Sequence, residues 1–183
     1  YDEGVILASK IFNKLKIKNE LGKLLYIRTH RYSGTGYCNQ FGYFRSNEKV
    51  NFKFQDNLPK WLPKKLKNKY LSYLNLYCHN INLLRYFLKI EPKVDYANIS
   101  KLNSGIVILD FNGLKVSVET KDYKDDFWDE SFIFFFEKGY LEIKTPPQQL
   151  VNYSSKVILF KRTKKPIKIS PKSSFTWSFK NQS

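Results

Sequence analysis

Methionine is absent from the 183 residues of the sequence, and cysteine occurs only twice, as Cys38 and Cys78. No second Cys or His lies at metal-ligand spacing from either cysteine, so we expect no metal site. So few cysteines fit a reducing compartment, and we expect a cytoplasmic protein. Because the chain begins with neither Met nor a secretory signal, we expect a fragment or a processed product.

A long apolar run is also missing. A membrane-spanning helix needs about 18 consecutive apolar residues, and the chain has no such run, so we expect no membrane partner. The 42% hydrophobic and 17% aromatic content excludes a disordered chain, because it is enough to build a core. The length corresponds to one domain, so residues 1–183 are predicted to fold as a single unit.

Acidic residues are few, since 16 Asp and Glu oppose 32 Lys and Arg and leave a formal net charge of +16. Such a charge is typical of proteins that bind nucleic acid or anionic membranes. Only five of the basic residues are arginine, however, and arginine is the side chain that binds phosphate and guanine bidentately. The loose lysine clusters at Lys60–Lys69 and Lys161–Lys172 are interpreted as solvated surface. We therefore do not favour a nucleic-acid partner.

The hydrophobic pattern predicts helices first and strands afterwards. Asp2–Asn19 and Lys64–Leu88 have helical periodicity, and Lys23–Tyr32 alternates as a strand. Six β-like runs follow Pro92: Val94–Ser100, Gly105–Phe111, Leu114–Thr120, Ser131–Phe136, Tyr140–Lys144 and Ser155–Phe160. Asn112-Gly113 predicts a hairpin turn, and Lys138-Gly139 predicts another. This order favours an α+β fold, with an open, mainly antiparallel sheet and helices packed on one face.

The second helical stretch is unusual because Leu71–Leu84 contains no Asp, Glu, Lys or Arg in fourteen residues. At the α-helical spacing, one stripe is apolar: Leu66, Tyr70, Tyr73, Tyr77, Ile81, Leu84 and Leu88. The opposite side is polar and uncharged: Ser72, Asn75, His79, Asn82 and Tyr86. A face that is polar without charge favours a wet cleft over bulk solvent.

His79 lies in the middle of that polar face, with Asn75 one turn before it and Asn82 one turn after it. Histidine exchanges protons near neutral pH, and neighbouring amides can orient it or bind hydroxyl groups. The same residues are also compatible with a hydrogen-bond network between helices. The pattern alone leaves both interpretations open.

Two loop segments bear on the class of protein. Gly34-Thr35-Gly36 follows a strand as in a dinucleotide-binding fingerprint, but Asn39 stands where the third glycine is required, so a Rossmann interpretation fails. An acidic cluster lacks the spacing of a calcium loop and is interpreted as a solvated hairpin tip: Glu119, Asp122, Asp125, Asp126, Asp129 and Glu130. Trp128, inside that cluster, is a candidate pocket wall or subunit contact.

Several stretches resemble the C-terminal domain of the glucose–fructose oxidoreductase, inositol dehydrogenase and MocA (Gfo/Idh/MocA) family. The similarity covers nearly the whole chain and rests on the order of its segments: Tyr1–Val5 through Glu20–Leu24, Arg28-Thr29-His30, His79–Tyr86, Phe127–Glu130, Lys138–Ile143 and Thr145–Pro147. The resemblance implies an NAD(P)-dependent oxidoreductase acting on a sugar, nucleotide sugar or polyol. NAD or NADP would be held mainly by an N-terminal Rossmann domain that is absent from this chain, and none is expected in this chain alone.

In that family, a D-x-x-x-H motif places a carboxylate and a histidine beside the reacting hydroxyl. In this chain the histidine matches His79, while Asn75 stands at the Asp position and cannot act as a general base. The resemblance implies that His79 is the catalytic acid or base and that Asn75 and Asn82 orient substrate. Arg31 and Tyr32 are candidates for a substrate phosphate or carboxylate.

We therefore expect a substrate-binding and oligomerisation domain, inactive by itself, which forms a homo-oligomer through the sheet face. Residues Ser131–Phe136 support this expectation because they are apolar on both faces of a strand. Two alternatives remain open. One is a non-catalytic binding or scaffold module of the same fold, and the other is a basic nucleic-acid-binding domain.

Overall fold

The computed structural model describes residues 1–34, 47, 58–100, 104–123, 127–147, 150–162 and 164–172. Its helices are α1 (Glu3–Lys18), the short 3-10 helix η2 (Lys64–Leu66) and α2 (Lys67–Leu88). Its strands are β1 (Leu24–Gly34), β2 (Lys93–Ile99), β3 (Gly105–Phe111), β4 (Leu114–Tyr123), β5 (Trp128–Phe136), β6 (Gly139–Lys144), β7 (Lys156–Lys161) and β8 (Ile167–Ile169).

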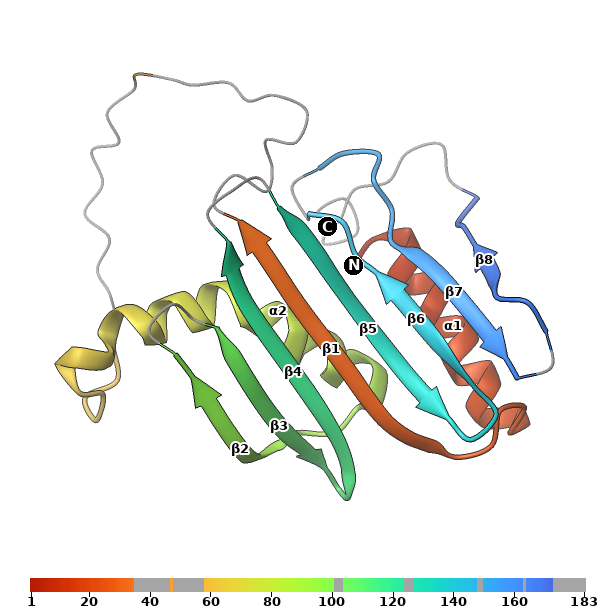
Figure 1. Cartoon of the computed structure of the whole chain (residues 1–183), viewed down its shortest axis with the longest axis horizontal. Helices are drawn as coiled ribbons and strands as arrows, with labels where there is room; N and C mark the ends of the chain where they lie inside the picture. The colour runs from red at the N-terminus through yellow and green to blue at the C-terminus, as the bar shows by residue number, and fades with distance from the viewer. Residues whose placement is uncertain are drawn as a thin grey trace.

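The strands form one open sheet in the order β2-β3-β4-β1-β5-β6-β7-β8. Every neighbouring pair is antiparallel except β1 and β4, which run parallel at the centre of the sheet. Helices α1 and α2 both lie behind the sheet, so its other face carries no helix (Figure 1). The predicted α+β class and its one-sided helical layer are confirmed.

Aromatic side chains join both helices to the centre of the sheet. Phe12 of α1, Phe87 of α2 and Phe134 of β5 are all buried, with ring centroids 4.9 to 5.4 Å apart. The buried residues of α1 include Val5, Ala8, Phe12 and Leu15, which follow the helical repeat. One core of aliphatic and aromatic side chains therefore fills the space between the helices and the sheet.

The start of α1 is fixed by the buried side chain of Asp2. Its Oδ1 accepts hydrogen bonds from the backbone N–H groups of Gly4 (2.7 Å) and Val5 (3.1 Å), as an N-cap does. The same carboxylate accepts from the hydroxyl of Ser155 at 2.6 Å, just before β7. A side chain on Gly4 would collide with the Ser155 carbonyl oxygen, so glycine is required for this close approach.

Most predicted elements are confirmed within a few residues. The structure adds β8 and extends the fourth strand to Tyr123, where the sequence pattern ended it at Thr120. Near the end of the first helix, Leu15 is buried in the core and Ile17 is exposed. No helix in the described part of the chain is both long and apolar enough to cross a membrane.

Candidate active site

Buried polar side chains gather on the helix side of the sheet, near the C-terminal end of β1. Arg31 of β1 lies opposite Glu130 of β5 in the strand register, so both side chains point toward the helices. Each residue is only 4% exposed. Charged side chains are rarely buried this deeply unless they are paired or functional.

Asn80 reaches the same place from α2 and is fully buried. Its Nδ2 donates to Oε1 of Glu130 at 3.1 Å and to Oγ1 of Thr29 at 3.3 Å. The hydroxyl of Thr145 donates to the other carboxyl oxygen of Glu130. We call Thr29, Arg31, Asn80, Glu130 and Thr145 the polar cluster.

Burial raises the pKa of Glu130 above its usual range, and this effect outweighs the opposing influence of Arg31, Thr145 and Asn80. A carboxyl group with a raised pKa keeps its proton to higher pH. It therefore offsets less of the positive charge of Arg31 than an ordinary carboxylate would. The positive character of the polar cluster thus comes from Arg31, whose charge Glu130 offsets only in part.

Trp128 holds the Arg31 side chain in place. The guanidinium carbon lies 4.7 Å from the centroid of the Trp128 ring, which is a cation–π geometry. The indole Nε1 donates to the backbone oxygen of Thr145 at 2.7 Å, so the ring itself is anchored to the polar cluster. The structure thus brings two of the predicted site residues, Arg31 and Trp128, into contact.

His79 lies directly before Asn80 on α2. It is partly exposed to solvent. Partial burial of the imidazole lowers its pKa, and the positive charge of Arg31 lowers it further. The lowered pKa favours the neutral imidazole at neutral pH, the form that can accept a proton. The structure therefore places His79 within electrostatic range of Arg31 and outside the core.

Tyr77 extends the buried polar region by one turn of α2. It is 1% exposed, and its hydroxyl donates to Oδ1 of Asp122 at 3.2 Å. Burial raises the pKa of this phenol, and the neighbouring Asp122 raises it further. Tyr77 therefore acts as a neutral hydrogen-bond donor beside the polar cluster.

The two asparagines predicted to orient substrate have different outcomes. Asn75 lies on α2, but its side chain falls outside the described part of the structure. Asn82 is exposed, and its Oδ1 accepts a hydrogen bond from Nη1 of Arg85 at 3.1 Å. Asn82 lines an open groove of about 450 Å³ near the C-terminal end of α2, together with Tyr1, Arg85, Tyr86, Lys89, Ile90 and Glu91.

Tyr32 does not join Arg31, although the two are adjacent in sequence. Successive side chains of a strand point to opposite faces, so Tyr32 lies on the face without helices. There its hydroxyl donates to Oε2 of Glu119 at 2.9 Å. The structure therefore places Arg31 and Tyr32, both candidates for a substrate phosphate or carboxylate, on opposite faces of the sheet.

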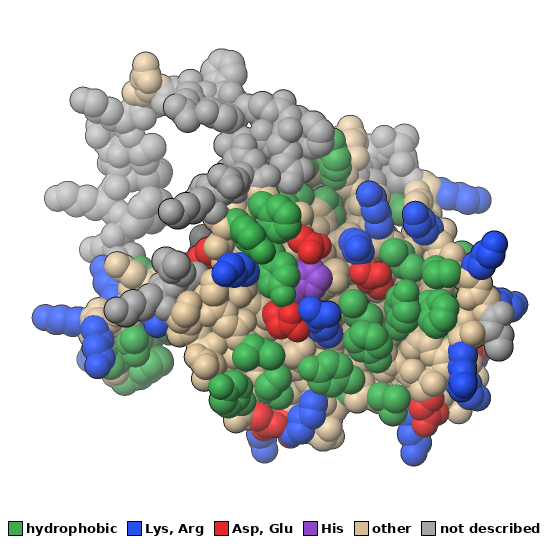
Figure 2. Space-filling model, viewed as in Figure 1, with side chains coloured by type: hydrophobic (Ala, Val, Ile, Leu, Met, Phe, Trp, Pro, Cys, Tyr) green, Lys and Arg blue, Asp and Glu red, His purple; other side chains and the backbone are tan. Residues whose placement is uncertain are grey.

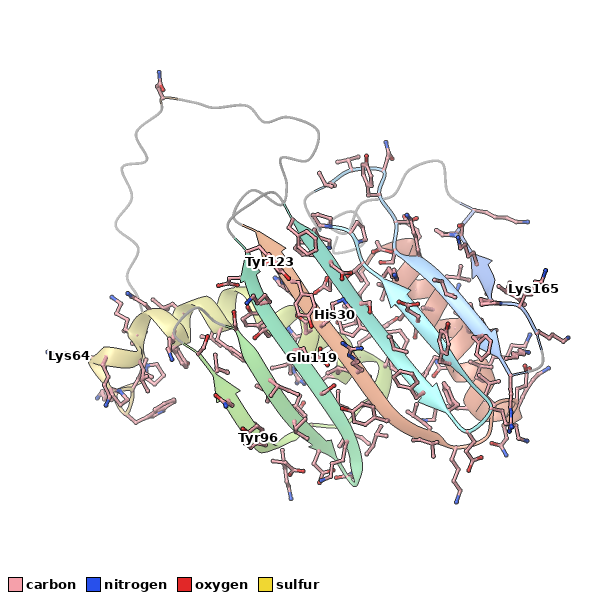
Figure 3. All side chains as sticks on the ribbon, in the orientation of Figure 1. His30, Lys64, Tyr96, Glu119, Tyr123 and Lys165 are labelled. Carbon is pink, nitrogen blue, oxygen red and sulfur yellow. The ribbon has the colours of Figure 1, made fainter. Side chains whose placement is uncertain are left out.

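The face without helices, which we call the open sheet face, has a polar centre. Arg28 binds Glu119 bidentately at 2.8 and 2.9 Å, and this contact lowers the pKa of Glu119. His30 stacks on Tyr32 with ring centroids 4.7 Å apart, and its Nε2 lies 3.1 Å from Oδ2 of Asp129. Figure 3 shows His30 and Glu119 side by side on neighbouring strands of this face.

Half-buried apolar side chains surround that polar centre, as Figure 2 shows. On β1, β5, β6 and β7 they are Tyr26, Ile133, Phe135, Tyr140, Ile158 and Phe160. The rings of Tyr140 and Phe160 stack with centroids 5.1 Å apart. Phe132, Phe134 and Phe136 of the same β5 strand are instead buried beneath the helices.

The acidic cluster is not a solvated hairpin tip where the structure describes it. Glu130 is buried, Asp122 bonds Tyr77 and Glu119 is paired with Arg28. Asp125 and Asp126, like Thr35 and Gly36, lie outside the described residues. Among the residues that are described, no group of three or more His, Cys, Asp or Glu side chains is arranged to hold a metal ion.

No family model matches the sequence, and no curated protein matches it. Solved structures share its fold. A dehydrogenase (MviM) from Clostridium difficile matches with a TM-score of 0.53 and 7% identity, over 94% of this chain and 46% of that chain. An oxidoreductase from Pseudomonas syringae matches with a TM-score of 0.55 and 10% identity, over 93% of this chain and 40% of that chain.

KijD10, a 3-ketoreductase from Actinomadura kijaniata solved in complex with NADP, matches with a TM-score of 0.51 and 12% identity, over 87% of this chain and 42% of that chain. Identities this low establish the fold alone. The chain spans less than half the length of each of these three structures. The predicted resemblance to oxidoreductases of the Gfo/Idh/MocA type is thus confirmed as a likeness of fold.

Sequence reasoning missed Asn80 and Glu130. Asn80 interrupts the buried side of α2, where Tyr77, Leu84 and Leu88 are apolar. A polar residue at a buried helix position indicates a partner across the interface, and this signal was present in the sequence. The burial of Glu130 was missed because the acidic residues around it favoured a solvated loop, although Glu130 is in phase with the buried Phe132, Phe134 and Phe136 of β5.

Proposed function

We propose that the chain is the substrate-binding domain of an NAD(P)-dependent oxidoreductase that acts on a sugar, nucleotide sugar or polyol. The observation offered for the proposal is that partial burial and the positive charge of the buried Arg31 both lower the pKa of His79. Shared fold with oxidoreductases supports the reaction class. The site supplies both a proton acceptor and a positive charge in one place.

In the proposed reaction, His79 accepts the proton of the substrate hydroxyl; a nicotinamide bound by the proposed Rossmann domain would supply the hydride chemistry at the carbon that bears this hydroxyl. In the reverse direction, protonated His79 returns that proton to the forming hydroxyl. The positive charge of Arg31 stabilises an oxyanion or binds an anionic substituent of the substrate. Asn75, which replaces a carboxylate, would bind a hydroxyl without moving a proton.

The cofactor is proposed to bind mainly to a separate Rossmann domain. The sequence contains no G-x-G-x-x-G, because Asn39 replaces the third glycine after Gly34 and Gly36. The residues of this chain therefore do not fit a dinucleotide fingerprint. The proposal accordingly predicts that this chain alone turns over no substrate.

The substrate class rests on the neighbouring proteins and on Arg31. One neighbour, a variant of KijD10, was solved with TDP-benzene and NADP. A substrate that carries phosphate would match the positive character of the polar cluster. We therefore place nucleotide sugars first among the three candidate substrate classes.

We also propose that two copies of the chain pack through the open sheet face. The half-buried aromatic side chains of this face support the proposal, because aromatic residues are enriched at protein interfaces. Arg28 and Glu119 would lie at the middle of that interface, with Tyr140 and Phe160 toward one side. The cytoplasm stays the predicted location.

The proposed reaction is tested by assaying the full-length protein for NAD(P) reduction with a panel of nucleotide sugars, sugars and polyols. His79→Ala and His79→Gln should each lower kcat by about 100-fold or more, the usual contribution of an acid–base group. His79→Gln keeps a hydrogen-bonding side chain, so its KM should change little. The scaffold alternative instead predicts no turnover with any substrate and no effect of His79 on ligand binding.

A further inference from the structure

The start of α2 forms a second surface that the proposed function leaves unused. The helix projects past the edge strand β2, and Lys64 lies at the far end of the projection (Figures 1 and 3). We name the projection the basic tip and define it as Lys60, Trp61, Lys64, Lys65, Leu66 and Leu74. We propose that the basic tip binds the surface of an anionic lipid bilayer.

The basic tip exposes large apolar side chains. Trp61 is 73% exposed, and its ring lies edge-on to Tyr70, with centroids 6.1 Å apart. Leu66, the last residue of η2, is 38% exposed, and Leu74 of α2 is 48% exposed. In Figure 2, hydrophobic side chains at this end of the molecule are bordered by lysines. Tryptophan is enriched where protein meets the bilayer interface.

The charge of the basic tip is of one sign. Lys60, Lys64 and Lys65 are exposed, and the sequence has no acidic residue between Leu58 and Ile90. None of the three lysines forms an ion pair with a residue in the described ranges. The lysines also lie near the positive end of the α2 dipole, which repels them. An anionic partner would relieve that repulsion.

A lipid surface fits these side chains better than a nucleic acid. The leucines offer hydrocarbon that can enter the boundary between headgroups and acyl chains, whereas nucleic acid offers no aliphatic partner. The cations are lysines, whose stems cover apolar surface while their charges remain at the headgroups. Residues 58–84 contain no arginine, the side chain that nucleic-acid recognition favours. A surface contact also needs no spanning helix, so the lack of a long apolar run does not oppose it.

The test is co-sedimentation of the purified chain with vesicles of phosphatidylcholine alone or mixed with phosphatidylglycerol. We expect binding only to the anionic vesicles, with loss of binding as salt screens the charges. The triple variant Lys60→Gln, Lys64→Gln, Lys65→Gln should weaken binding by about tenfold or more. Its matched control carries Gln at Lys164, Lys165 and Lys168, which are exposed at the opposite end of the sheet, and should change binding less than about twofold.

Quenching of tryptophan fluorescence tests whether Trp61 is the residue that contacts the bilayer. Brominated lipid should quench tryptophan fluorescence in the wild type, and Trp61→Phe should remove most of that quenching while Trp128→Phe does not. The proposal is overturned if anionic vesicles do not bind, or if the two triple variants lose binding equally. Tighter binding to a single-stranded oligonucleotide with the same variant dependence would overturn it in favour of a nucleic-acid surface. The lysine variants change only exposed side chains, so circular dichroism should show the same fold.

Discussion

Asn80 of α2 donates a hydrogen bond through Nδ2 to Oε1 of Glu130 in β5, across 3.1 Å, and neither residue is more than 4% exposed. This contact links the helix that carries His79 to the strand that faces Arg31. A shift of α2 would therefore separate His79 from the positive charge that lowers its pKa. The buried Asn80 amide therefore holds α2 in position against β5 at the candidate site.

Removing the Asn80 amide should destabilise the domain. Asn80→Ala removes the donor that Asn80 supplies to Oε1 of Glu130 and to Oγ1 of Thr29, which costs about 1–3 kcal/mol of the free energy of unfolding. Urea denaturation measures the loss. The exposed Asn82→Ala should stay within about 0.5 kcal/mol of the wild type. Equal effects at the two positions would show that Asn80 does not support the polar cluster.

The raised pKa of Glu130 predicts a dependence of stability on pH. The native state holds the Glu130 proton more tightly than the unfolded chain does. The free energy of unfolding of the wild type therefore falls as pH rises above about 4.5, the ordinary pKa of the group, toward the raised pKa of the native state. Glu130→Gln cannot titrate there. Its stability relative to the wild type should therefore increase between about pH 5 and pH 8.

Urea denaturation at the two pH values tests this slope. The exposed Glu91→Gln controls for the loss of one negative charge from a basic protein. A relative stability of Glu130→Gln that falls as pH rises would mean that pairing with Arg31 outweighs burial. In that case the pKa of Glu130 would lie below its usual range, and Glu130 would offset the charge of Arg31 as an ordinary carboxylate does.

The pKa of His79 should respond to the charge of Arg31. Arg31→Gln removes the nearby cation, so the His79 pKa should rise toward its ordinary value near 6.5, while Arg31→Lys should keep it low. Proton NMR titration resolves the effect, since His30 and His79 are the only histidines. If the pKa of His79 is the same in Arg31→Gln as in the wild type, the charge of Arg31 does not act on His79. The proposed site would then lack its electrostatic link.

The open sheet face should control assembly. Tyr140→Lys places a charge among half-buried rings of the proposed interface and should convert the oligomer to a monomer. Light scattering coupled to size-exclusion chromatography measures the mass. Ile17→Lys, at an exposed apolar position on the helix side, should leave the mass unchanged. A wild type that is monomeric at all concentrations would contradict the interface.

Local signals predicted much of the fold because they act within a few residues. Asn112-Gly113 forms the turn between β3 and β4 with both residues at positive φ, as its residue types predict. Asn19 and Gly22 end the first helical unit in the same conformational region. The parallel pairing of β1 with β4 could not be predicted, because it depends on contacts between residues about 90 positions apart.

The candidate site was predicted less completely. The structure brings the predicted residues Arg31 and Trp128 into contact, and the charge of Arg31 lowers the pKa of His79, while their roles at a substrate site stay predictions. The alternation predicted for Lys23–Tyr32 already implies that Arg31 and Tyr32 lie on opposite faces of the sheet. The burial of Glu130 was not predicted, because α2, β1 and the Thr145 segment all converge on it only in the folded chain.

The most direct test of the proposed function is turnover by the full-length protein carrying His79→Ala, followed by the absorbance of the reduced nicotinamide. We expect the wild type to oxidise a nucleotide sugar, sugar or polyol, and the variant to bind the same substrate while its kcat falls by about 100-fold or more. Full turnover by His79→Ala would contradict the assignment of His79 as the group that moves the proton.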